Sequence, residues 1–360
     1  MATTSTSTTT TPKKIEGFYY QILDSSMKPQ SAPLYMPMTL HKPPRAHHNN
    51  NNNNYSVQIV PGFPNIEIHY SSHCVLLVSA RNRADLYVCN PCAAQCWSLP
   101  ARESRSLFAT AIDFDASATT NAYRVFAFSK VFIMGQPLIA AEVYCSVTDA
   151  WTKRSPIALT REATTQPPPP ASAVAKANGG MYVMAERDRL MRFDVEGSAP
   201  TRAVRLPTTG EPWRVDTRCL GVSEGMILYG FLDGFLFRVW ELQSDEGWKM
   251  RHSVTVQWLW GKLREAAMPT RVRTPPGVFA PLGFHGDVEG VFFQMDERVV
   301  VLEMKTKEME VVYRKVGGME GGGEFRGSFS VFSYSPCKCG AVGAEGGGSR
   351  GVDDGLELKL

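Results

Sequence analysis

The sequence predicts an all-β fold of the propeller type, with about six blades, some of them incomplete. Two observations carry this prediction. Apolar residues come in short runs bounded by turn residues, as in strands, and a strand–turn–aromatic unit recurs along the chain. At 360 residues the chain can bury a large core, and 43% hydrophobic with 20% charged residues is typical of a folded globular protein.

The short apolar runs are rich in Val, Phe, Tyr and Ile, which favour strands. The expected strands are 57–60, 74–79, 85–89, 123–129, 141–146, 181–185, 226–230, 236–241, 290–295 and 299–304. Helical periodicity is scarce, and 258–267 is the best candidate for one short helix.

In the recurring unit, a short strand ends at a turn residue and an aromatic or aliphatic residue follows a few positions later. One such residue from each unit serves as an anchor: Trp97, Trp151, Val204, Trp248 and Met309. Subtraction of their numbers gives intervals of 54, 53, 44 and 61 residues. This is the spacing of propeller blades, nearer to kelch than to WD40 repeats. Each unit is then the outer hairpin of a four-stranded sheet that stacks on its neighbours. A β-sandwich with core tryptophans is the alternative.

Low-complexity segments divide the chain into one propeller-like domain, expected over 15–336, and flanking tails. The segments expected outside regular structure are a disordered Ser/Thr-rich tail at 1–14, loops at 41–54 and 163–172, and a flexible Gly-rich tail at 337–360.

Charge and hydropathy indicate which kinds of partner and which cellular compartment to expect. Lys plus Arg number 38 against 35 Asp plus Glu, and the basic residues form no long stripe, so no nucleic-acid partner is expected. No apolar run reaches membrane-spanning length, and the Ser/Thr-rich start lacks the apolar core of a signal peptide. We therefore expect a cytoplasmic and/or nuclear protein whose eight cysteines stay reduced, without disulfides.

Two motifs suggest chemistry, and each has a simpler structural interpretation. Gly221 to Gly225 fits the G-x-S-x-G pattern of a hydrolase around Ser223, but a strand follows instead of a helix, so a β-turn is favoured. The cysteines that suggest a zinc site are Cys89, Cys92, Cys96, Cys337 and Cys339. They lack the paired C-x-x-C spacing of a closed site and are interpreted as small buried thiols. We expect no metal, no cofactor and no enzymatic activity.

The candidate binding residues are polar or aromatic side chains between strands. Arg187 and Arg189 stand in an expected turn and could pair with acidic or phosphorylated groups, or remain solvated. Trp258 and Trp260 in the expected helix are possible binding anchors, with core packing as the alternative. His285 lies in an expected Gly-bounded turn and is a candidate ligand contact, with capping of the turn as the more common role of such a histidine.

The order of the anchors resembles that of plant F-box-associated domains, the often kelch-like C-terminal modules of F-box proteins. Asn90-Pro91 followed by Trp97 and Leu99-Pro100 is similar to the "NP…W…LP" signature of that family. The later landmarks Trp151, Trp240 and Trp248 follow in the same order, so the resemblance covers most of the chain.

The resemblance implies an adaptor. In such proteins an F-box docks on the Skp subunit of a cullin–RING ubiquitin ligase and the β domain captures a protein substrate. Residues 1–44 contain no helical, Leu-rich F-box pattern. We therefore expect a protein-interaction module with an unidentified protein substrate, which meets Skp only if an F-box is supplied elsewhere. The alternative is a kelch-like or galactose-oxidase-like propeller with an enzymatic or carbohydrate-binding role.

Overall fold

The computed structural model of the chain describes sixteen ranges of residues, to which every structural statement below refers. They are 17–23, 33–37, 55–56, 66–80, 85–91, 95–104, 106–114, 122–159, 173–186, 188–197, 201–207, 217–243, 247–266, 279–285, 289–314 and 328–334. The segments expected at 1–14, 41–54, 163–172 and 337–360, and the strand expected at 57–60, lie outside these ranges.

The described residues form six antiparallel sheets of four strands each, which confirms the propeller and the expected number of blades. Blade 1 contains β1 (Gly17–Leu23), β2 (Leu34–Pro37), β3 (Tyr55–Ser56) and β24 (Ser328–Tyr334). Blade 2 contains β4 (Ile66–Ser72), β5 (Val75–Ala80), β6 (Leu86–Asn90) and β7 (Gln95–Ser98). Blade 3 contains β8 (Ala109–Phe114), β9 (Tyr123–Ile133), β10 (Gln136–Cys145) and β11 (Ala150–Ala158).

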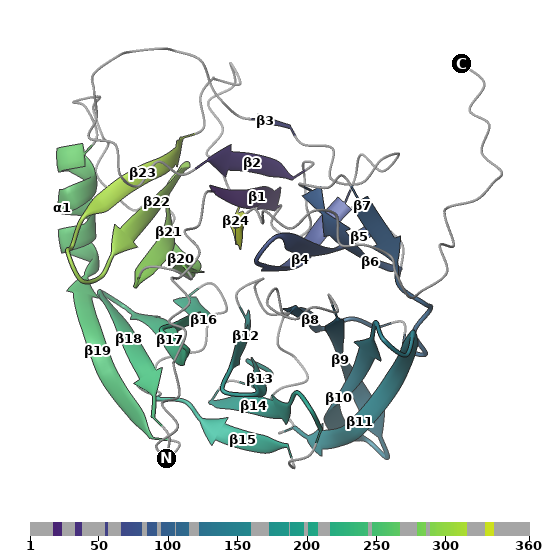
Figure 1. The fold of residues 1–360 in the computed structure, drawn as a ribbon. Coiled ribbons are helices and arrows are strands. Elements are labelled where there is room, and N and C mark those ends of the chain that lie inside the picture. Colours follow the sequence, from purple (N-terminus) through teal and green to yellow (C-terminus); the bar gives the residue numbers. More distant parts are fainter. Residues whose placement is uncertain are drawn as a thin grey trace, which may run out of the picture.

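The remaining strands complete blades 4 to 6. Blade 4 contains β12 (Val174–Ala177), β13 (Gly180–Val183), β14 (Arg189–Asp194) and β15 (Arg202–Arg205). Blade 5 contains β16 (Arg218–Ser223), β17 (Met226–Asp233), β18 (Leu236–Leu242) and β19 (Trp248–Thr255). Blade 6 contains β20 (Phe279–His285), β21 (Gly290–Met295), β22 (Arg298–Glu303) and β23 (Met309–Arg314). A helix, α1 (Val256–Ala266), follows blade 5 and packs outside β19 and β23 (Figure 1).

The ring is closed by strands from both ends of the sequence. The innermost strands β4, β8, β12, β16, β20 and β24 contact one another in turn around the centre (Figure 1). β24 pairs with β1 from Gly17↔Tyr334 to Leu23↔Ser328. Residues more than 300 positions apart by number therefore share blade 1, which closes the ring.

The blade topology gives the propeller two faces. Because the strands of a blade are antiparallel, its first and third turns lie at one end and its second turn at the other. We call these ends the first-turn face and the second-turn face. Glu224, between β16 and β17, lies on the first-turn face, and Met134, between β9 and β10, lies on the second-turn face.

The core lies between neighbouring blades, where aromatic side chains from adjacent sheets interlock. Phe128 of blade 3 packs on Phe193 of blade 4 with ring centroids 5.0 Å apart, and Phe237 of blade 5 meets Phe293 of blade 6 edge-on at 4.8 Å. These four rings are almost fully buried. Burial of each such side chain contributes about 1.5–3 kcal/mol, so the contacts between blades hold the ring together.

The anchors predicted from the sequence lie on the outermost strands of the blades, as expected for outer hairpins. Trp97, Trp151, Val204, Trp248 and Met309 each occupy the outermost strand of a different blade, β7, β11, β15, β19 and β23. The indole N–H of Trp151 donates to the carbonyl of Pro100 (2.8 Å), and that of Trp248 donates to the carbonyl of Arg205 (2.7 Å). Each carbonyl belongs to the preceding blade, so these tryptophans tie neighbouring blades together at the rim.

The other family landmarks lie in blades 2 and 5. Asn90 is buried at the end of β6, Pro91 follows it, and Trp240 is a buried residue of β18. The G-x-S-x-G segment is a hairpin, because Ser223 ends β16, Glu224 and Gly225 form the turn with φ of 52° and 76°, and β17 follows. The β-turn interpretation of this motif is correct.

The expectation that the chain has no disulfide is wrong. Cys89 on β6 and Cys96 on β7 are direct cross-strand partners with Cα atoms 4.1 Å apart, and they form a disulfide. Sequence spacing did not reveal the pair, because only the register of the hairpin places the two thiols opposite each other. Cys92, Cys337 and Cys339 lie outside the described residues.

Candidate functional site

The hairpin of β9 and β10 projects from blade 3 on the second-turn face. Ile133 pairs with Gln136, so Met134 and Gly135 form a two-residue turn, with φ of 49° and 76°. Positive φ at both positions is characteristic of a type I′ turn, which normally selects Asn and Gly. Met134 therefore occupies a backbone conformation that disfavours its long side chain.

The tip of this hairpin is apolar and exposed. Phe132 is 62%, Ile133 51% and Met134 fully exposed to solvent. Single exposed apolar residues are ordinary, but consecutive large ones on a protruding turn are typical of an interaction site. The Met134 side chain is fully exposed, so burial of this side chain adds no stability to the fold.

A second exposed aromatic side chain lies on the same face, two blades further on. Phe235, in the turn between β17 and β18, is 85% exposed. Its carbonyl accepts a hydrogen bond from the backbone N–H of Val256, the first residue of α1 (2.8 Å). The backbone of this tip is therefore already engaged by the chain itself.

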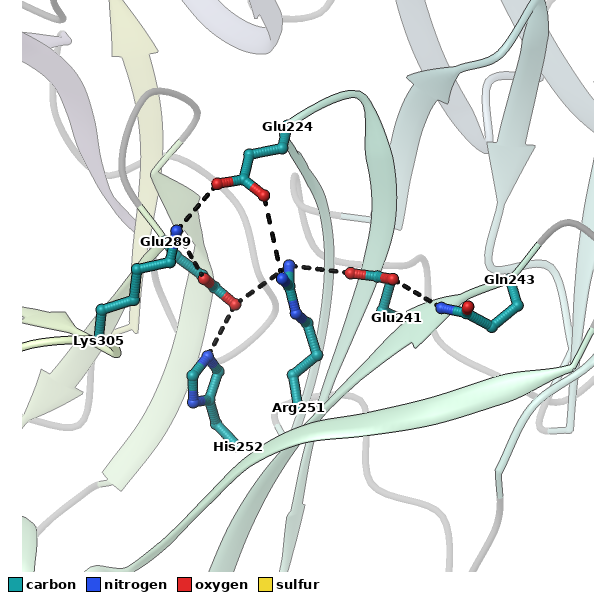
Figure 2. A network of polar contacts seen from close by, with 7 residues as sticks. All are labelled: Glu224, Glu241, Gln243, Arg251, His252, Glu289 and Lys305. Atoms are coloured by element: carbon teal, nitrogen blue, oxygen red, sulfur yellow. Dashed lines mark hydrogen bonds and ion pairs between the residues drawn. The ribbon is translucent and has the colours of Figure 1, made fainter.

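The first-turn face carries a different kind of surface, a network of charged side chains between blades 5 and 6 (Figure 2). Its centre is Arg251 of β19, which lies 2.8 Å from Glu241, 3.4 Å from Glu289 and 3.9 Å from Glu224. Lys305 lies 2.9 Å from Glu224 and 3.4 Å from Glu289. Each cation thus bridges carboxylates of both blades.

The carboxylate of Glu289 is the buried member of this network, with a side chain only 1% exposed. It also lies 2.7 Å from Nε2 of His252, and Gln243 donates to Glu241 at 2.6 Å (Figure 2). The hydrogen bond from Lys305 lowers the pKa of Glu224 and raises that of Lys305. Every carboxylate of the network lies within 4 Å of Arg251 or Lys305, so the ion pairs hold the two blades together.

A second set of ion pairs joins blades 3 and 4 on the same face. The guanidinium of Arg124 binds both carboxylate oxygens of Glu196, with the Nη2 contact at 2.8 Å. Lys176 on β12 pairs with Asp113 on the adjacent inner strand β8. Burial, and then the charge of Asp113, raises the pKa of the nearby Tyr70 to about 12. Here too each charge is matched by a neighbour across the blade boundary.

The arginine turn expected from the sequence is only partly described. Arg187 lies outside the described residues. Arg189 begins β14 on the second-turn face, and its Nε lies 3.7 Å from Glu186 and 3.8 Å from Asp188. Its charge is therefore balanced within its own turn.

The aromatic candidates are partly or wholly inside the fold. Trp258 and Trp260 of α1 are half-buried against the core of blades 5 and 6. The helix is capped by Thr255, whose hydroxyl accepts from the N–H of Trp258 (3.1 Å). Core packing, the alternative interpretation of these tryptophans, therefore accounts for their position.

His285 is the last residue of β20 and not part of an exposed turn. It is buried and stacks on Phe292 with ring centroids 5.7 Å apart. Neither ring nitrogen has a hydrogen-bond partner within the described ranges, and burial lowers the pKa of His285 to about 4. A neutral, enclosed imidazole cannot reach a ligand at the surface.

Sequence reasoning missed the tip of the β9–β10 hairpin. A run of four apolar residues, Val131 to Met134, followed by Gly135 was the available signal. In sequence it is indistinguishable from a buried strand, whereas in the structure it extends beyond the residues of β9 that pair with β8.

The six-bladed architecture agrees with the family to which the sequence matches. The family model of the F-box protein At3g26010-like β-propeller matches residues 54–323. The chain belongs to this family. The matched part of this F-box-associated propeller contains blades 2 to 6, whereas β1, β2 and β24 of blade 1 lie outside it.

Solved structures give weaker likenesses, and no curated protein matches the chain. A chain of the mitotic checkpoint complex is 9% identical, with 76% of this chain and 72% of that chain covered and a TM-score of 0.36. Apo AztD from Citrobacter koseri is 10% identical, with 89% and 98% covered and a TM-score of 0.39. The Myxococcus xanthus glutaminyl cyclase is 14% identical, with 64% and 88% covered and a TM-score of 0.27.

Two further properties concern only the described residues. Among them, no helix is long and apolar enough to cross a membrane. No group of three or more His, Cys, Asp or Glu side chains in these ranges is placed to hold a metal ion.

Proposed function

We propose that this F-box-associated propeller captures a protein substrate for a Skp–cullin–F-box ubiquitin ligase, and that it does so with the tip of the β9–β10 hairpin on its second-turn face. Skp binding is expected only where an F-box is supplied elsewhere. In this proposal the chain binds without catalysing, and it acts in the cytoplasm and/or nucleus.

The observation that carries the proposal is the exposure of Phe132, Ile133 and Met134 together on one turn. Large apolar and aromatic side chains dominate the binding energy of protein interfaces, because a partner removes them from water. Between Val131 and Pro137 the tip has no ionisable side chain. Such a surface suits an apolar pocket or strand of another protein better than it suits a polar substrate or a sugar.

The proposal is tested by comparing proteins that co-purify with the tagged full chain and with variants of it. The Phe132→Ala/Met134→Ala double variant should lose its specific partner, whereas Phe235→Ala, an equally prominent aromatic on the same face, should retain it. Retention by the double variant would contradict the proposed site. Loss by Phe235→Ala alone would move the site to blade 5.

The ligase part of the proposal needs its own experiment. The purified chain is mixed with Skp, with an F-box-containing relative as positive control. We expect no direct binding by this chain, and binding after fusion to an F-box. Direct binding would mean that a docking segment lies in this chain.

A further inference from the structure

On blade 3, β9 extends past the end of its inner neighbour. β8 pairs with β9 from Phe114↔Tyr123 to Ala109↔Phe128, but β9 continues to Ile133. The chain before β8 follows a little further, because Ser106 accepts from the hydroxyl of Ser129 and the Phe108 ring lies 4.3 Å from Nζ of Lys130. Beyond this point, no described strand lies beside β9 on that side.

Two printed hydrogen bonds define which backbone groups face the open side. The N–H of Phe108 donates to the carbonyl of Phe128 (2.8 Å), so the backbone groups of Phe128 point toward β8. Backbone direction alternates along a strand, so Phe132, four residues later, points the same way. Opposite Phe132 stands Pro137, which has no N–H and whose carbonyl accepts from Leu159 (2.9 Å). The N–H and C=O of Phe132 therefore face outward, without a backbone partner among the described residues.

Beyond Lys130, this short open edge lacks the usual protection against strand pairing. Natural sheet edges are guarded by charges, prolines or bulges, because an unpaired edge is a template for another strand. Val131, Phe132 and Ile133 carry no charge, and the exposed Phe132 and Ile133 side chains extend to either side of the strand. At the comparable tip of blade 5, by contrast, Val256 already occupies the carbonyl of Phe235.

We propose that the edge of β9 at Val131–Ile133 binds an extended segment of the protein partner, which adds to blade 3 as a further strand. This inference rests on the proposed function and specifies its partner chemistry. The segment is uncharged and carries β-branched or aromatic residues at alternate positions, to pack beside Phe132 and Met134. A second copy of this chain is the competing occupant, and the sedimentation experiment below distinguishes it.

The test uses the full chain and a library of short random peptides selected for binding to it. Selected peptides are synthesised, and their affinities are measured for the wild type, Phe132→Pro, Phe132→Ala and Phe235→Ala. Phe132→Pro removes the outward N–H without breaking the β9–β10 ladder. It should weaken binding about tenfold more than Phe132→Ala does, since the alanine variant keeps that N–H. Phe235→Ala should have no effect.

A second measurement does not depend on the proline variant folding. Peptides are methylated at one backbone nitrogen at a time and tested on the wild-type chain. Strand addition predicts that alternate positions are sensitive. Uniform or absent sensitivity, or failure to select any peptide that prefers the wild type to Phe132→Pro, would overturn the inference. Dimerisation of the chain that Phe132→Pro abolishes in sedimentation would also overturn it, because the occupant would then be a second copy.

The two proposals fail separately. If the Phe132→Ala/Met134→Ala variant loses the natural partner but peptide binding shows no dependence on backbone N–H groups, the tip is the binding site and strand addition is wrong. If that variant keeps the natural partner, the proposed function is wrong as well.

Discussion

The two faces of the propeller differ in the side chains that they expose and in whether those side chains contact the rest of the fold. On the first-turn face, Arg251 and Lys305 bridge three glutamates of blades 5 and 6, and Arg124 binds Glu196 across blades 3 and 4. On the second-turn face, the tip of the β9–β10 hairpin exposes apolar side chains that touch little of the fold. The charged side chains of the first face pair within the chain, whereas we propose that the apolar tip of the second face contacts a partner. Substitutions should therefore change stability on one face and binding on the other.

The largest expected effect is on the first-turn face. Glu289→Ala removes the buried carboxylate that contacts Arg251, His252 and Lys305. The partly buried side chains of Arg251 and His252 then lose this partner. We expect a loss of about 3 kcal/mol in the free energy of unfolding, measured by urea denaturation. Glu224→Ala is the matched control, because its exposed side chain should matter little. Equal effects of the two substitutions would mean that burial of Glu289 is irrelevant.

A smaller effect comes from the buried His285 and depends on pH. Its pKa is lowered from 6.5 to about 4 in the folded protein, so the folded state holds it neutral while the unfolded chain protonates it. Stability from this group is complete above the unfolded pKa and is lost as pH falls toward 4. At pH 5 the loss is about 2 kcal/mol. His285→Leu should reduce the loss of stability between pH 7 and pH 5 by that amount. An unchanged pH dependence would show that His285 is not buried neutral.

Substitutions on the second-turn face should change partner binding. Phe132→Ala is expected to weaken partner binding about tenfold or more, as aromatic anchors do, while its free energy of unfolding changes by less than about 0.5 kcal/mol. Calorimetric titration with the identified partner and urea denaturation check both values. A large loss of stability with normal binding would assign Phe132 to the fold instead.

The smallest expected effect is that of Met134→Asn, which separates the contribution of the Met134 backbone conformation to stability from that of its side chain to binding. Asn tolerates positive φ better than Met does, so Met134→Asn should stabilise the chain by about 0.5–1 kcal/mol, seen as a higher Tm. It should also weaken partner binding. A stabilised variant that binds normally would show that the Met134 side chain is dispensable to the partner.

The sequence was informative where a repeat made local patterns reinforce one another. Trp97, Trp151 and Trp248 lie on the outermost strands of three blades, as their spacing predicted. Features that depend on the register between two strands could not be predicted from the sequence. They include the pairing of β24 with β1 and the disulfide between Cys89 and Cys96.

The candidate site was hidden for a related reason. Phe132 and Ile133 have the composition of a core strand, but they lie beyond Phe128, the last residue of β9 that pairs with β8, and are exposed. His285 shows the converse, since a histidine near glycines looked accessible but lies within a packed strand. Exposure is a property of neighbouring elements, which one local stretch of sequence does not encode.

The most direct test of the account compares contact with the partner at the two faces. A photo-crosslinking amino acid is placed at position 134 or at position 224 of the otherwise unchanged chain, and each protein is mixed with the partner that the wild type retains. We predict crosslinking from position 134, its loss when Phe132→Ala is added, and none from position 224. Crosslinking from position 224 but not from position 134 would place the partner on the charged face and rule out the tip of the β9–β10 hairpin as the binding site.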